Sequence, residues 1–90
     1  MNKLYDITPI YVERLPQALE HGVIYISKEY KCSVHLCPCG CGQKVYVPID
    51  EQGWTLTEES GTITLSPSIG NFELPCESHY FIRKNKIVWV

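Results

Sequence analysis

The chain has 90 residues, of which eight are lysine or arginine and ten are aspartate or glutamate, so its formal net charge is −2. This length allows one modest hydrophobic core and predicts a single domain over residues 1–90. The slightly acidic balance does not favour a nucleic-acid-binding or membrane-surface protein, and no apolar stretch approaches the ~20 residues of a membrane span. Since the N-terminus also lacks the apolar run of a signal peptide, we expect a cytoplasmic protein.

The first half of the chain predicts one helical turn and three strands. Residues 16–22 have a proline near their start and a glycine at their end, which is typical of a short helix. Residues 23–27 are β-branched, aromatic and apolar, and they predict a strand. Residues 33–36 and 44–48 flank a cysteine-rich turn, so we expect them to pair as a hairpin.

The next segment predicts a second hairpin followed by a loop. Residues 54–57 and 62–65 alternate in polarity on either side of a turn that contains Gly61. The proline, glycine and serine content of residues 66–71 predicts a loop there.

The last predicted element is a hairpin of residues 79–83 and 86–90. A two-residue turn between them would place Tyr80 opposite Trp89, Ile82 opposite Ile87, and Arg83 opposite Lys86. The predicted fold class is therefore mostly β: a small antiparallel, zinc-stabilised domain of hairpins with one short helical turn.

Five residues form the candidate metal site. Cys37, Cys39 and Cys41 stand on alternate positions of one glycine-rich run, and Cys76 and His79 form a Cys-x-x-His pair farther along the chain. Thiolate sulfur and imidazole nitrogen are the ligands that Zn²⁺ prefers in a tetrahedral site. We therefore predict one Zn²⁺ bound by Cys76, His79 and two or three of the first three cysteines, among which the sequence does not choose.

Other readings of these residues are weaker. His35 is a sixth ligand candidate, but it fits a strand that leads into the cysteine run, and Cys32 fits a small apolar side chain on that strand. Five cysteines cannot all pair in disulfides, and a bridge between residues two apart would be strained. In a cytosolic protein, clustered cysteines are more typical of a metal site than of a disulfide framework.

Several motifs together resemble one known family over residues 14–90. The motifs, in chain order, are Cys-Pro-Cys-Gly-Cys-Gly, Trp54-Thr55-Leu56, Leu65-Ser66-Pro67-Ser68-Ile69, Cys76-x-Ser78-His79-Tyr80-Phe81-Ile82 and a terminal tryptophan. This order resembles the uncharacterised family numbered 6527 among domains of unknown function. The resemblance implies a zinc protein with an accessory role in a bacterial ubiquitin-like conjugation or defence system. It also implies a ubiquitin-like or E1-like component as the protein partner.

Three function classes remain open, and the first is a closed zinc module that binds a protein partner. The second is a zinc-dependent hydrolase or deconjugating enzyme, which needs an open coordination position and a general base. Glu73 and Glu77 lie near the site in sequence, and Ser66 or Ser68 could act as a nucleophile. However, such glutamates are usually solvated, Ser-Pro-Ser is usually a turn, and no His-Glu-x-x-His or deaminase-type motif is present, so the sequence favours a non-enzyme.

The third class is a zinc module that binds nucleic acid. Its basic face would be made of Lys28, Lys31, Arg83, Lys84 and Lys86, with Tyr30 as a stacking ring. Scattered lysines on a slightly acidic chain are more typical of a solvated surface. We therefore expect a small zinc-binding accessory protein that acts through protein–protein interaction.

Overall fold

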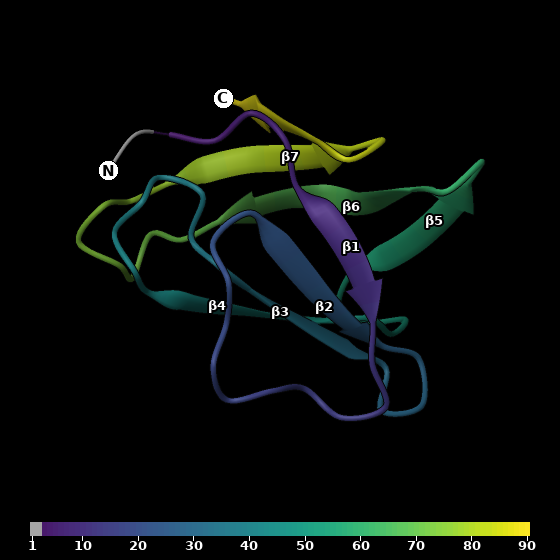
Figure 1. Cartoon of the computed structure of the whole chain (residues 1–90). Coiled ribbons are helices and arrows are strands. Elements are labelled where there is room, and N and C mark those ends of the chain that lie inside the picture. The colour runs from purple at the N-terminus through teal and green to yellow at the C-terminus, as the bar shows by residue number, and fades with distance from the viewer. Residues whose placement is uncertain (1–2) are drawn as a thin grey trace.

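The computed structural model describes residues 3–90, which fold into two four-stranded β-sheets (Figure 1). The first sheet has the strand order β1-β2-β3-β4: β1 (Thr8–Tyr11), β2 (Val23–Ser27), β3 (Cys32–Leu36) and β4 (Lys44–Pro48). The second sheet has the order β5-β6-β7-β8: β5 (Thr55–Glu59), β6 (Thr62–Gly70), β7 (His79–Arg83) and β8 (Lys86–Trp89). The predicted mostly β class is confirmed.

The first sheet contains the expected hairpin of β3 and β4 and one strand that the sequence did not reveal. β2, β3 and β4 pair in antiparallel fashion, with His35 opposite Val45. β1 pairs with β2 in parallel fashion. Parallel pairing requires a crossover connection and leaves no local turn signal, which explains why β1 was not predicted.

The second sheet is an antiparallel meander in which the predicted terminal register is confirmed. Ile82 lies opposite Ile87, and Tyr80 lies opposite Trp89. The turn between β7 and β8 places Lys84 and Asn85 at positive φ, 48° and 64°. A tight two-residue hairpin turn needs this left-handed backbone at both positions.

The core is one cluster of apolar side chains drawn from both sheets. In β4, Val45 and Val47 are buried while the alternate residues are exposed, and in β7 Tyr80 and Ile82 alternate with more exposed neighbours. This period of two is the pattern of strands with one face against a core. The partly exposed residues of β7, including His79, therefore lie on the other face of the second sheet.

Two sequence predictions are wrong in detail. Residues 16–22 form bends and a turn, with no helix, because a single helical turn is costly to nucleate without further hydrogen bonds. The segment that was expected to be a loop continues β6 as far as Gly70. The strand is irregular there: Leu65 pairs with Ile82 and Ile69 with Tyr80, so three residues of β6 face one of β7.

The segment before β1 connects the two sheets. Ile7 donates its backbone N–H to Asn85 O at 2.9 Å, and Ile87 donates to Tyr5 O at 2.9 Å, so this segment lies along β8 before the chain enters the first sheet. Residues 3–90 contain no helix long and apolar enough to cross a membrane.

Candidate active site and cysteine cluster

Four of the five predicted metal-site residues come together. The sulfur atoms of Cys37, Cys39, Cys41 and Cys76, which we call the cysteine quartet, all lie within 4.8 Å of one another. The Cys37 sulfur is 3.4 Å from that of Cys39 and 3.8 Å from that of Cys76, and Cys41 is 3.8 Å from Cys76. Four sulfurs around one tetrahedral ion with ~2.3 Å bonds would lie roughly 3.8 Å apart, so the quartet could hold a metal ion.

The quartet joins two distant segments of the chain. Three of its members lie in the turn between β3 and β4, where Gly40 and Gly42 adopt positive φ of 93° and 83°. That conformation costs glycine little and reverses the chain tightly enough to gather alternate cysteines. Cys76 arrives from the connection between β6 and β7.

Burial and neighbouring polar groups shift the pKa values of Cys37, Cys39 and Cys41 in different directions. Burial raises the pKa of Cys37 to about 12, and burial likewise raises the pKa of Cys41. Burial acts in the same direction on Cys39, but hydrogen bonds from Ser78 and from the neighbouring thiols outweigh it and lower its pKa to about 6. One thiol of the group is therefore ready to lose its proton, as a metal ligand must.

Ser78 and Asn71 hold the quartet from the side of the second sheet. Ser78 Oγ lies 3.2 Å from the Cys76 sulfur and 3.4 Å from the Cys37 sulfur. Asn71 Nδ2 lies 3.9 Å from the Cys37 sulfur and donates to the Tyr80 hydroxyl at 3.3 Å. These contacts connect the quartet directly to the start of β7.

His79, the fifth predicted ligand, is not part of this group. Its Nε2 lies 2.8 Å from Ser68 Oγ, so it forms a close pair with a serine of β6. The reason is strand alternation: β7 begins at His79, and His79 therefore points to the face opposite Tyr80, whose hydroxyl extends toward Asn71 on the quartet side.

Aromatic rings fix the orientation of the His79 imidazole. Phe72 approaches it edge-on with a centroid distance of 5.4 Å, and Phe81 is stacked at 6.5 Å with an angle of 26° between the ring planes. The Arg83 guanidinium lies 4.1 Å from the centre of the Phe81 ring on the same face of β7. His79 is thus confined between two rings with its Nε2 toward Ser68.

Ser68 lies in the irregular part of β6, where three residues oppose one. Such bulges redirect side chains and are frequent next to active sites. The carbonyl of Ser68 accepts a hydrogen bond from the Trp54 indole Nε1 at 3.3 Å, which holds the backbone of the serine. Ser66, the other serine considered as a nucleophile, is exposed, and its side chain forms no hydrogen bond among residues 3–90.

The other candidate residues belong neither to the quartet nor to the Ser68–His79 pair. His35 is fully buried; its Nε2 lies 2.6 Å from the Tyr80 hydroxyl, and burial lowers its pKa to about 4. Cys32 is half-buried on β3 and is a free thiol outside the quartet. Glu77 lies in the turn before β7 with φ of 48°, and it forms no ion pair within the described part of the chain.

The Ser68–His79 pair was not identified from the sequence. The two residues are eleven positions apart, and no motif joins them. The sequence suggested Ser68 as a nucleophile and His79 as a metal ligand, but the strand that carries His79 was expected to pair only with residues 86–90. The Ser-Pro-Ser segment predicted a loop, so no strand was expected beside His79.

A family model matches residues 11–90, and its description is "BubE: Bacterial ubiquitination-like system serine protease". No match was found among curated proteins or among solved structures. The match supports the expected association with bacterial ubiquitin-like systems, while the assignment to the family numbered 6527 stays a prediction. Because the matched region covers nearly the whole chain, the protein belongs to the BubE family of the bacterial ubiquitination-like system.

Proposed function

We propose that this protein is a serine protease that cleaves a protein of a bacterial ubiquitination-like system, with Ser68 as nucleophile and His79 as general base. The observation that carries the proposal is the 2.8 Å separation between Ser68 Oγ and His79 Nε2. This is the hydrogen-bond distance at which an imidazole can accept the hydroxyl proton. The description of the family as a serine protease agrees with this pair.

The chemistry follows from the two side chains. Ser68 Oγ attacks the carbonyl carbon of the scissile peptide or isopeptide bond while its proton passes to His79 Nε2. The carbon–nitrogen bond then breaks as His79 returns that proton to the departing amine, leaving an ester on Ser68. A water molecule gives a proton to His79 Nε2 and attacks the ester carbonyl carbon. The bond between this carbon and Ser68 Oγ then breaks as His79 returns the proton to Oγ, which releases a carboxylic acid and restores both residues.

The imidazole is oriented by packing. Within residues 3–90, no hydrogen bond reaches His79 Nδ1, so no carboxylate completes a triad there. The edge of Phe72 and the face of Phe81 restrict the ring instead. We therefore assign a catalytic dyad in which aromatic contacts provide the orientation that a third polar group provides in a triad.

The cysteine quartet supports the proposal that the protein holds Zn²⁺, with all four ligands from cysteine and His79 left free for catalysis. A closed four-thiolate site has no open position for a water molecule, so the bound ion would supply stability and not a nucleophile. Its contribution would be to fix the connection between β6 and β7, which ends at His79.

The substrate is proposed from the family's description: a ubiquitin-like component or a conjugate of it. In this proposal the ubiquitin-like component is a substrate as well as a binding partner, which differs from the accessory role expected from the sequence. An E1-like partner and a cytoplasmic location stay predictions.

Covalent labelling with a fluorophosphonate, which reacts with activated serines, tests the dyad. The wild-type protein should be labelled once, at Ser68, and Ser68→Ala and His79→Ala should lose the label. Ser66→Ala is the matched control, because it removes a neighbouring serine of the same strand that has no histidine partner. Labelling that survives Ser68→Ala would contradict the assignment, and no labelling of folded wild-type protein would favour a binding module.

A further inference from the structure

We propose that the free edge of β4 binds an extended segment of the substrate as an added strand and leads it to Ser68. The inference rests on the proposed protease function and adds to it the form in which the substrate is recognised. It starts from the position of β4, which is the last strand of the first sheet and pairs only with β3 among the described strands.

The backbone hydrogen bonds of β4 show which of its groups face outward. The N–H of Cys37 donates to Gln43 O, on the side of β3, whereas Pro48 O accepts from the N–H of Trp54, on the opposite side. Because backbone groups alternate in direction along an antiparallel strand, Lys44 and Tyr46 face the same way as Pro48. Within residues 3–90, their N–H and C=O groups have no backbone partner.

A hollow lies beside these unpaired groups. Its volume is about 340 Å³, and it is lined by Lys44, Val45 and Tyr46 of β4 on one side and, on the other, by residues 70–74, which begin at the last residue of β6. The side chains of Tyr46 and Phe72 are among its lining residues and are 63% and 64% exposed. Figure 1 shows β4 running beneath the segment that joins β6 to β7. The hollow therefore offers unpaired main-chain groups with an aromatic residue on each wall.

Both ends of the free edge lead to the dyad. At one end Gly70 lines the hollow and is the strand partner of His79. At the other end Trp54, whose backbone is bonded to Pro48, donates its indole N–H to the carbonyl of Ser68. A chain segment lying along β4 would thus run beside the catalytic pair.

The chemistry of the edge selects the occupant. Unpaired N–H and C=O groups on alternate residues are complementary to the main chain of an extended peptide, which can pair with a strand edge irrespective of its side chains. A helix has already satisfied its own backbone groups and could not pair in this way. The substrate segment is therefore extended where it binds, and its side chains contact Tyr46 and Phe72.

Two variants of Tyr46 separate the main-chain contact from the ring. Tyr46→Pro removes the outward N–H. β4 already has a proline, Pro48, at a position whose backbone faces the same free edge, so proline is compatible with this edge. Tyr46→Thr removes the aromatic ring and keeps the N–H. The probe is a library of peptides from a digested bacterial proteome, and fluorophosphonate labelling of Ser68 is measured on the same samples to report a folded dyad.

Tyr46→Pro should cleave the library peptides at least about tenfold more slowly than Tyr46→Thr, with labelling unchanged. On wild-type protein, N-methylation along one cleaved peptide should inhibit at alternate residues, because only alternate amides face β4. Equal cleavage by the two variants, or inhibition without this period of two, would overturn the inference. So would normal labelling with no peptide cleaved, whereas absent labelling of the wild type would instead contradict the dyad itself.

Discussion

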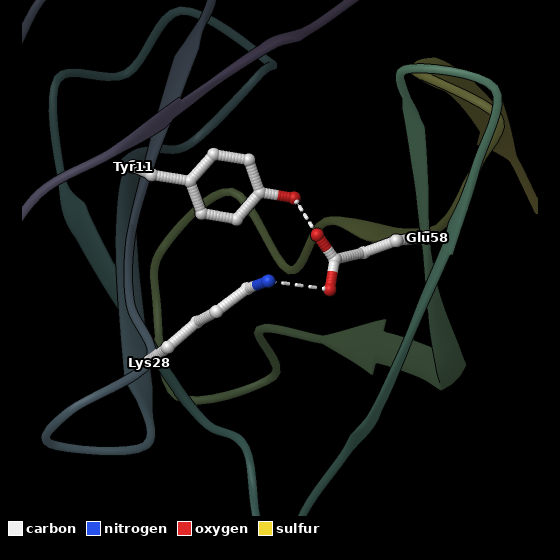
Figure 2. Close-up of polar contacts among 3 residues, drawn as sticks. All are labelled: Tyr11, Lys28 and Glu58. Carbon is white, nitrogen blue, oxygen red and sulfur yellow. Dashed lines mark hydrogen bonds and ion pairs between the residues drawn. The ribbon is translucent and has the colours of Figure 1, made fainter.

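Two side-chain clusters connect the two sheets, and they do so with different chemistry. The cysteine quartet joins the turn between β3 and β4 to the connection that precedes β7. A polar cluster joins Tyr11 of β1 and Lys28 after β2 to Glu58 of β5, as Figure 2 shows. Each cluster therefore bridges the same pair of sheets from different strands.

The polar cluster lies in solvent. The Tyr11 hydroxyl donates to one oxygen of Glu58 at 2.5 Å, while Lys28 lies 2.8 Å from the other oxygen and 5.0 Å from the Tyr11 ring centroid. Desolvation and the hydrogen bond to Glu58 raise the pKa of Tyr11 to about 12, and the hydrogen bond from Lys28 lowers the pKa of Glu58. Exposed contacts of this kind contribute little to stability, because water competes for every partner.

The quartet differs because its contribution to stability would depend on a bound metal ion. Cys37 is fully buried, and thiolates gathered this closely repel one another unless a cation lies between them. Metal binding to such a site is itself folding free energy. If the quartet holds the proposed ion, one sheet-to-sheet connection depends on a ligand, whereas the other consists of exposed polar contacts alone.

The largest effect is expected when Cys76, the single quartet member in the connection between β6 and β7, is changed to serine. The variant should lose bound Zn²⁺ and melt far below the wild type, because the ion would have no ligand from this side. Elemental analysis and a thermal melt of the same preparation measure both effects. A variant with full metal content and a normal melt would show that the quartet is not the metal site.

A chelator should produce nearly the same loss in the wild-type protein. It should also slow fluorophosphonate labelling of Ser68, because Ser78 contacts two quartet sulfurs and directly precedes His79. The control is Cys76→Ser, which should not respond to the chelator. If labelling persists at its full rate in protein shown to be metal-free, the quartet does not position the dyad.

Cys32→Ser should have a much smaller effect, because Cys32 is half-buried on β3 and lies outside the quartet. A cost of about 1 kcal/mol is typical of such a substitution, and metal content should remain one ion per chain. Denaturant unfolding of this variant beside Cys76→Ser gives the comparison. Equal losses would place Cys32 in the site after all.

Glu58→Gln should have the smallest effect of the four. It removes the charge that Lys28 pairs with, yet the cluster is exposed, so the melting temperature should stay within measurement error of the wild type. Thermal melts at low and high salt would check this. A large, salt-sensitive loss would mean that the polar cluster carries as much of the sheet-to-sheet connection as the quartet.

The sequence predicted those parts of the fold that depend on local signals. Alternation along residues 79–90 and a two-residue turn were enough to place Ile82 opposite Ile87. The parallel partner of β2 and the continuation of β6 to Gly70 depend on contacts between distant segments, and no local pattern indicates them. The short helix predicted for residues 16–22 is absent because packing does not support its local signal.

The candidate site was likewise predicted only where local signals indicate it. Cysteine spacing placed all four quartet members among the candidate ligands, since ligand chemistry is visible in composition, but it did not choose among Cys37, Cys39 and Cys41. The Cys-x-x-His spacing also suggested His79 as a ligand. However, His79 is the first residue of β7, and its imidazole points to the face of the second sheet opposite the quartet, where it contacts Ser68. The pairing of Ser68 with His79 depends on the bulge in β6. The sequence does not indicate how this bulge shifts the register of β6 against β7.

The indole that holds Ser68 also provides an optical reporter. Trp54 donates to the carbonyl of Ser68, the proposed nucleophile, whereas Trp89, the other tryptophan, packs against Tyr80 with the ring planes tilted by 60° and donates to Leu4 O. In a Trp89→Phe background, intrinsic fluorescence would come from Trp54 alone. The proposed ester would form on the side chain of the residue whose backbone carbonyl Trp54 contacts, so a change in Trp54 emission could report single turnovers in unlabelled protein.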